Sequence, residues 1–265
     1  MQSRVREALG LRFEPVAVLF RDERPDGALG FADGRRGCVM WLFAQAALGK
    51  TVALSRETVG CPGGAVGLGF ADGFPDVERH SYFLSVGVEG TGAPERLVAQ
   101  ARAMPESSMK EHILHGERYW RDPAAAAAFL ELLPKIPAPP AWVVLMPLSA
   151  LPAGEEAAVV VFVANPLQLA GLVTLANYRL PEADGVIIPP GAGCMQFHLW
   201  AVAEGERDFP RVIVGLIDPT ARLAVKRTLG TDVLTVAVPW RRFVEFEEDV
   251  AGSFLETAEW RELSS

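Results

Sequence analysis

Short runs of aliphatic and β-branched residues alternate along this chain with longer stretches of helical spacing. An apolar run after Pro15 predicts a buried strand, and a polar loop then leads to an apolar helix that ends at Gly49. This alternation continues to the C-terminus and is typical of a mixed sheet covered by helices, so we expect an α/β or α+β fold. The expected strands span residues 16–20, 51–54, 142–146, 157–163, 185–188, 211–214 and 233–238. The main expected helices span residues 2–9, 94–103, 124–133, 166–178 and 194–203.

The segment 134–141, with the sequence PKIPAPPA, is the clearest internal boundary. Four prolines in eight residues favour an extended connection. We therefore expect an N-terminal half (residues 1–133), a proline-rich connection and a C-terminal half (residues 142–265) that pack as one globular unit. Each half contains a strand, a loop, a Gly-Cys pair and an apolar helix in that order. This layout suggests two similar halves that arose by duplication.

Charge and hydropathy exclude several classes of function. The chain has 33 Asp and Glu against 25 Lys and Arg, a net charge of −8, whereas a general nucleic-acid binder or a protein of anionic membrane surfaces needs a basic face. The longest apolar run, residues 157–175, is interrupted by Asn165 and Pro166, so we expect no membrane span. The N-terminal segment lacks the apolar core of a signal peptide, and three cysteines are too few for a disulfide scaffold. A soluble, cytoplasmic protein is the expectation.

The cysteines share one local pattern, because Cys38, Cys61 and Cys194 each directly follow a glycine. Two of them clearly stand where an apolar helix begins. Amide groups of a first helical turn stabilise a thiolate, so this placement predicts thiols with a lowered pKa. Arg35 and Arg36 would add positive charge ahead of Cys38. The pattern favours sulfur atoms that act as ligands or nucleophiles.

Three converging thiolates would suit a soft metal centre, either zinc with a fourth ligand or an iron–sulfur cluster held by three cysteines. His198 follows Cys194 by four residues on the same predicted helix face and is the candidate fourth ligand. No CxxC pair is present, and 22 and 132 residues separate the successive cysteines. The residues alone therefore leave a second interpretation open, in which the three cysteines are small hydrophobic residues of the core.

Glycines are concentrated around the second cysteine. The sequence ETVGCPGGAVGLGF places Gly63, Gly64, Gly67 and Gly69 within seven residues. The spacing matches neither phosphate-binding loop, so we expect close backbone packing around Cys61 instead of a nucleotide site. Gly63, Gly64 and Gly193 join the cysteines as candidate site residues. A glycine-lined pocket that binds a small molecule without a metal is the alternative.

Several motifs together resemble a known family. They are LRFEPVAVLF, Cys38 before an apolar helix, CPGGAVGLG, GAGCMQ and IDPTAR. Over about residues 9–239 the chain resembles the DUF169 family of uncharacterised prokaryotic proteins. The resemblance carries no activity, but it implies that Cys38, Cys61 and Cys194 occupy family motif positions. It thereby favours a cofactor site over a role in the core.

The leading hypothesis is a [4Fe–4S] cluster bound by Cys38, Cys61 and Cys194, with a role in electron transfer, redox sensing or chemistry at an open iron. The alternatives are a metal-free small-molecule site and a structural zinc site that adds His198. A redox partner or a small-molecule ligand is expected. The acidic C-terminal helix has apolar residues at helical spacing and leaves a homodimer open. Sulfur atoms lying far apart in the fold would contradict a shared site.

Overall fold

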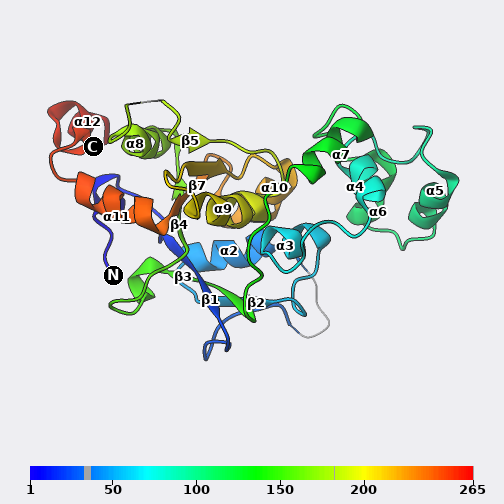
Figure 1. Ribbon diagram of the computed structural model, residues 1–265, viewed down its shortest axis with the longest axis horizontal. Helices are drawn as coiled ribbons and strands as arrows, with labels where there is room; N and C mark the ends of the chain where they lie inside the picture. Colours follow the sequence, from blue (N-terminus) through cyan, green and yellow to red (C-terminus); the bar gives the residue numbers. More distant parts are fainter. Residues whose placement is uncertain (33–36, 182, 265) are drawn as a thin grey trace. The chain divides into compact units, whose positions relative to one another are not determined.

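The structure is a computed structural model that describes residues 1–32, 37–181 and 183–264. Within these residues, seven strands form one open mixed sheet in the order β2-β3-β1-β4-β7-β6-β5 (Figure 1). The β5–β6 pair is parallel and the other pairs are antiparallel. The expectation of a mixed sheet with helices is confirmed. The strands are β1 (Val16–Arg21), β2 (Val52–Ser55), β3 (Trp142–Pro147), β4 (Val159–Ala164), β5 (Val186–Ile187), β6 (Val212–Gly215) and β7 (Leu234–Pro239).

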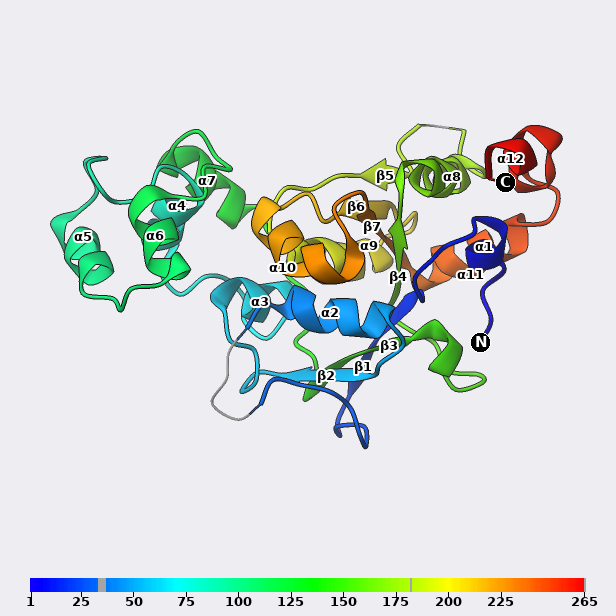
Figure 2. The same ribbon diagram turned by 180° about the vertical axis from the view of Figure 1, so that it is seen from behind.

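Helices cover both faces of the sheet, because successive strand residues point to opposite faces and both sets are apolar. In β1, Val16 and Val18 enter one hydrophobic core, and Ala17 and Leu19 enter the other. The first core is covered by α2 (Val39–Ala47), the π-helix η2 (Met195–Trp200), α9 (Ala201–Gly205) and α10 (Pro219–Leu229). The second is covered by α1 (Arg4–Ala8), α8 (Pro166–Asn177), α11 (Trp240–Asp249) and α12 (Ala258–Ser264), which Figure 2 shows together.

Two helix starts show how the sequence fixes these boundaries. Asn165 accepts a hydrogen bond from the Gln168 backbone N–H, and the Gln168 side chain accepts one from the Asn165 N–H, with Pro166 in the first turn. This reciprocal cap explains why the long apolar run breaks into β4 and α8 instead of continuing as one helix. Asp218 caps the start of α10 by accepting hydrogen bonds from the N–H groups of Thr220 and Ala221.

The chain forms two compact units whose boundaries differ from those expected. One unit comprises residues 1–71 and 135–265, and the other comprises residues 72–134. The reason is strand pairing: β1 and β2 both pair with β3, so the start of the chain belongs to the same body as everything after the proline-rich segment. The second unit is helical, and its helices are α4 (Val77–Leu84), α5 (Glu95–Arg102), α6 (Ser108–His115) and α7 (Pro123–Glu131). Its small core contains Val88, Leu97, Val98, Ala101 and Ile113.

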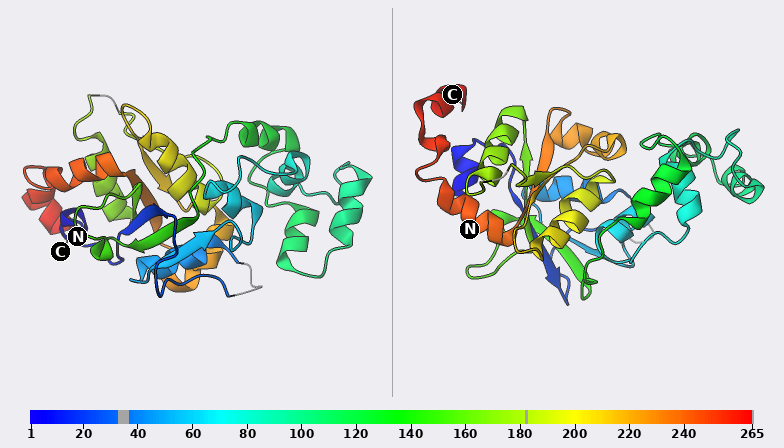
Figure 3. Two further views of the ribbon diagram at one scale, coloured as in Figure 1. Left: turned by 60° about the horizontal axis from the view of Figure 1, so that its bottom comes forward. Right: turned by 45° about the horizontal axis from the view of Figure 1, so that its top comes forward.

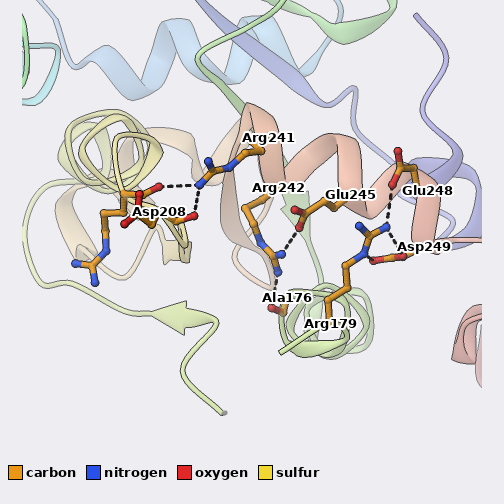
Figure 4. A network of polar contacts seen from close by, with 9 residues as sticks. Ala176, Arg179, Asp208, Arg241, Arg242, Glu245, Glu248 and Asp249 are labelled. Atoms are coloured by element: carbon orange, nitrogen blue, oxygen red, sulfur yellow. Dashed lines mark hydrogen bonds and ion pairs between the residues drawn. The ribbon is translucent and has the colours of Figure 1, made fainter. Parts of the chain in front are cut away.

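A network of arginines attaches α11 to its neighbours (Figure 4). Arg242 is buried, pairs with Glu245 and donates to the Ala176 carbonyl of α8 at 2.8 Å. Arg179 pairs with two carboxylates at the end of α11, Glu248 at 2.9 Å and Asp249 at 2.8 Å. The acidic C-terminal helix therefore packs on its own unit, where Figure 3 shows it beside α8.

Candidate functional site

Each cysteine occupies the residue directly before a helix. Cys38 precedes α2, Cys61 precedes the six-residue helix α3 (Pro62–Gly67), and Cys194 precedes the π-helix η2. The Cys61 sulfur accepts a hydrogen bond from the Gly64 N–H at 3.1 Å, and the Cys194 thiol donates to the Gly63 carbonyl at 3.4 Å. The prediction that apolar helices begin at Cys38 and Cys194 is confirmed, and Cys61 follows the same pattern.

Glycines let the three cysteine-bearing segments touch. A Cβ atom at Gly64 would lie 2.9 Å from Cγ2 of Val39, the first residue of α2, and 3.1 Å from the Cys61 sulfur. A Cβ atom at Gly67 would lie 2.9 Å from the Cys194 sulfur. The two contacts at 2.9 Å, with Val39 and with the Cys194 sulfur, are too short for a Cβ atom, so glycine is required at both positions. Helix α3 is thus packed against both α2 and η2.

Gly193 makes the third close contact. A Cβ atom there would lie 3.1 Å from Sδ of Met40 in α2 and 3.0 Å from Cβ of Ala221 in α10. The first turns of α2, η2 and α10 therefore meet beside Cys194. Gly63 is less constrained, because a Cβ atom added there would lie no closer than 4.0 Å to its nearest neighbour, Ala192. The predicted close packing around Cys61 thus depends on Gly64 and Gly67. Gly193 allows a similarly close approach of α2 and α10 beside Cys194.

The prediction of lowered thiol pKa values is wrong. Burial raises the pKa of Cys38 to about 11, and it also raises the pKa of Cys61 and, most strongly, that of the fully buried Cys194. Amide N–H groups at the helix starts oppose this effect, but loss of hydration outweighs them. Arg35 and Arg36, which were expected to add positive charge, lie outside the described residues. The half-buried thiols of Cys38 and Cys61 and the buried thiol of Cys194 are therefore protonated near neutral pH and are poor nucleophiles.

The same pKa shifts show that the sulfurs are close enough to influence one another. After burial, the charge of Cys61 is the next cause of the raised pKa of Cys194, followed by the charge of Cys38. Cys61 also raises the pKa of Cys38. The buried carboxylate of Asp218 acts on both Cys38 and Cys194 in the same direction. The three thiols therefore influence one another electrostatically across 132 intervening residues, and we refer to Cys38, Cys61 and Cys194 together as the cysteine cluster.

His198 is completely buried, and its ring is oriented toward α3. Its Nδ1 lies 2.9 Å from the Gly67 carbonyl oxygen, which can only accept, so Nδ1 carries the proton. In the part of the chain that the structure describes, Nε2 has no hydrogen-bond partner. Burial lowers the pKa of His198 to about 4 and keeps the imidazole neutral. Only Nε2 therefore remains available for a metal.

Sequence reasoning missed Gln196, which lies two residues after Cys194 and is completely buried. Its amide donates to the Pro189 carbonyl at 2.8 Å and accepts from the Leu216 N–H at 2.8 Å. Leu216 has a φ of 61°, a strained conformation for a non-glycine residue. A glutamine in the otherwise apolar segment MQFHLW was the available signal, and the structure shows that it connects the loops that lead to Cys194 and to α10.

Other features of the structure bear on the alternatives. A cavity of about 290 Å³ lies beside α1, and its lining, which includes Ser3, Arg6, Glu14 and Leu148, contains no cysteine. Over residues 1–32, 37–181 and 183–264, no three His, Cys, Asp or Glu side chains form a group that could hold a metal ion. None of the helices in these ranges is long and apolar enough to cross a bilayer.

Comparison with known families decides the relationship that the motifs indicated. The family model DUF169, described as "Uncharacterised ArCR", matches residues 4–249. The chain belongs to this family. The match spans all three cysteines and both compact units, so the DUF169 region includes the inserted helices. Comparisons with curated proteins and with solved structures each returned no match.

Proposed function

We propose that this DUF169 protein binds an iron–sulfur cluster, [4Fe–4S], through Cys38, Cys61 and Cys194. The observation that carries the proposal is the packing of three cysteine-bearing helix starts against one another through Gly64, Gly67 and Gly193. The three cysteines come from distant parts of the chain, and the buried carboxylate of Asp218 acts on two of them. Thiolates are the ligands that iron–sulfur clusters use.

The residues present fit such a cluster chemically. A bound cluster would deprotonate the thiols, and its positive iron ions would offset the unfavourable burial of thiolate charge that raises their pKa. Amide groups at the helix starts, such as the Gly64 N–H at the Cys61 sulfur, would donate to the sulfurs and tune the reduction potential. With three protein ligands, one iron would keep an open position for a small ligand or for electron exchange.

The raised pKa values also argue against a metal-free catalytic thiol. A nucleophilic cysteine needs a lowered pKa and an electropositive setting. Burial raises the pKa at all three positions, and Asp218 adds negative charge near two of them. Ligation to a metal overcomes this penalty, whereas a free thiolate would pay it in full.

Anaerobic reconstitution with ferrous iron and sulfide tests the proposal. We expect a brown protein that has the broad visible absorption typical of iron–sulfur proteins. It should contain about four iron and four sulfide ions per chain. Replacing Cys61 or Cys194 with serine is expected to abolish this spectrum, whereas the control His115→Gln, in an exposed histidine of the inserted unit, leaves it unchanged. A colourless wild-type protein would contradict the cluster, and stoichiometric zinc in that protein would support the zinc alternative.

A further inference from the structure

The helix that carries Cys61 is poorly suited to stand by itself. Helix α3 has six residues, Pro62–Gly67, and three of them are glycines. Glycine is the poorest helix former after proline, and helices of one or two turns are unstable without packing. Something outside α3 must therefore hold it, and through it the Cys61 sulfur, in place.

The contacts of α3 with η2 occur at both of its ends. At the N-terminal end, the Gly63 carbonyl accepts from the Cys194 thiol at 3.4 Å, which is a weak bond. At the C-terminal end, the Gly67 carbonyl accepts from Nδ1 of His198 at 2.9 Å. The second bond is shorter, is completely buried and is made by a nitrogen donor. It is the stronger of the two connections.

A metal ligand needs a free ring nitrogen that faces the metal. His198 Nδ1 already bonds to the end of α3 that lies one turn beyond the Gly63–Cys194 contact. The packing of Phe20 edge-on against the His198 ring, with the centroids 5.6 Å apart, further fixes the imidazole in this orientation. These contacts indicate that His198 fixes the position of α3.

We propose that His198 is a positioning residue, whose Nδ1–H holds the glycine-rich helix α3 against η2 and so sets Cys61 relative to Cys194. The functional meaning of this role rests on the proposed cluster. The attachment of α3 to η2 by His198 does not depend on whether a cluster binds. The neutral imidazole, favoured by complete burial, is the form that leaves Nδ1 as donor and Nε2 unprotonated. His198 is then not the fourth ligand.

Two variants whose side chains branch at Cγ, as the imidazole does, separate these roles. His198→Asn keeps an N–H donor at the same number of bonds from Cα as Nδ1, but it has no atom in place of Nε2. His198→Leu has a similar size and no donor. Both are studied without metal by hydrogen exchange of residues 61–70 and by the rate at which iodoacetamide alkylates Cys61. Both are also studied by the visible and electron paramagnetic resonance spectra after anaerobic reconstitution.

We expect His198→Leu to raise the exchange of the α3 amides and the alkylation of Cys61 by up to about tenfold, as loss of one buried hydrogen bond allows. His198→Asn is expected to restore both rates and to give the wild-type spectrum. Unchanged rates in His198→Leu, or failure of His198→Asn to restore them, would overturn the proposal. So would an Asn variant that protects α3 but loses the spectrum, since Nε2 would then be a ligand.

The outcome also separates this proposal from the cluster itself. If the wild-type protein takes up no cluster, the proposed function fails. The exchange and alkylation rates still decide whether His198 holds α3.

Discussion

A single buried imidazole makes the stability of this protein depend on pH. His198 has a pKa of about 4 in the folded state, below the value of about 6.5 that an exposed histidine has. As the pH falls below about 6.5, the unfolded chain takes up a proton that the folded protein does not accept until about pH 4. The free energy of unfolding therefore decreases over this window.

Comparing wild type with His198→Asn isolates this contribution. We expect the wild type to lose about 3 kcal/mol more than the variant between pH 7 and pH 4, as measured by urea denaturation at a series of pH values. Other titrating groups are common to both proteins and cancel in the difference. Parallel pH profiles would show that His198 is not held neutral in the folded state.

Alanine substitutions at two glycines of α3 test the close packing, because they are expected to change the free energy of unfolding in opposite directions. In Gly67→Ala, the added Cβ would lie 2.9 Å from the Cys194 sulfur and 3.0 Å from the Met195 nitrogen, so we expect a loss of about 1–3 kcal/mol. In Gly63→Ala the nearest neighbour is 4.0 Å away, and alanine favours the helix by up to about 1 kcal/mol. Chemical denaturation measures both. Equal effects would contradict the packing described.

At the level of residues, the sequence identified the cysteines and their glycines but not the electrostatics around them. The Gly-Cys pattern predicted helix starts, and helix starts by themselves lower a thiol pKa. The opposite shift arises because Cys194 is buried against residues more than a hundred positions away, such as Gly63 and Gly67. Desolvation depends on tertiary packing, which local spacing does not contain.

The attachment of helix α11 depends on one of two adjacent arginines. Arg242 is buried and donates to the Ala176 carbonyl, whereas its neighbour Arg241 is exposed and donates to carbonyl oxygens in the loop that contains Asp208 (Figure 4). We expect Arg242→Met to lower the free energy of unfolding by about 2 kcal/mol, because it leaves a buried carbonyl without a donor. The matched control Arg241→Met should cost less than about 1 kcal/mol. Thermal denaturation of both variants checks the difference.

Elements with strong local signals were predictable. Helix α8 begins at Pro166 and α10 at Pro219, because Asn165 and Asp218 cap them through contacts within three residues. A helix was predicted over residues 194–203, and the structure shows that its first part, η2, is a π-helix. Within this π-helix, Gln196 bonds to two loops and His198 bonds to α3. Partners such as Gly67 and Leu216 are distant in the sequence, so local spacing does not reveal these contacts.

The chain leaves the sheet-containing unit at residue 71 and returns to it at residue 135, and the segments next to these two points lie close together. A Cβ atom at Gly69 would lie 2.9 Å from Cδ1 of Ile136, so the chain on either side of residues 72–134 lies close together. We expect replacement of residues 73–133 by a short Gly-Ser linker to leave the sheet folded and, on the proposed function, to leave iron uptake by the three cysteines unchanged. Circular dichroism, cooperative thermal unfolding and reconstitution test this. Loss of cooperative unfolding would show that the sheet needs the insert.

The class of fold was predictable for the whole molecule, but the division into units was not. Alternating apolar strands and helices indicated a mixed sheet, and the proline-rich segment after Pro134 does mark a boundary. The sequence did not reveal that the other boundary lies at residues 71–72, because pairing of β1 and β2 with β3 is set by the register of strands distant in the chain.

The place of β1 in the sheet has a consequence during synthesis. β1 lies between β3 and β4, so neither of its neighbours exists until more than a hundred further residues have left the ribosome. Until then the apolar strands β1 and β2 are without partners and are candidates for chaperone binding. Cys194 emerges later still. On the proposed function, delivery of the cluster would follow translation of most of the chain, because a nascent chain that holds only Cys38 and Cys61 would lack the third proposed ligand.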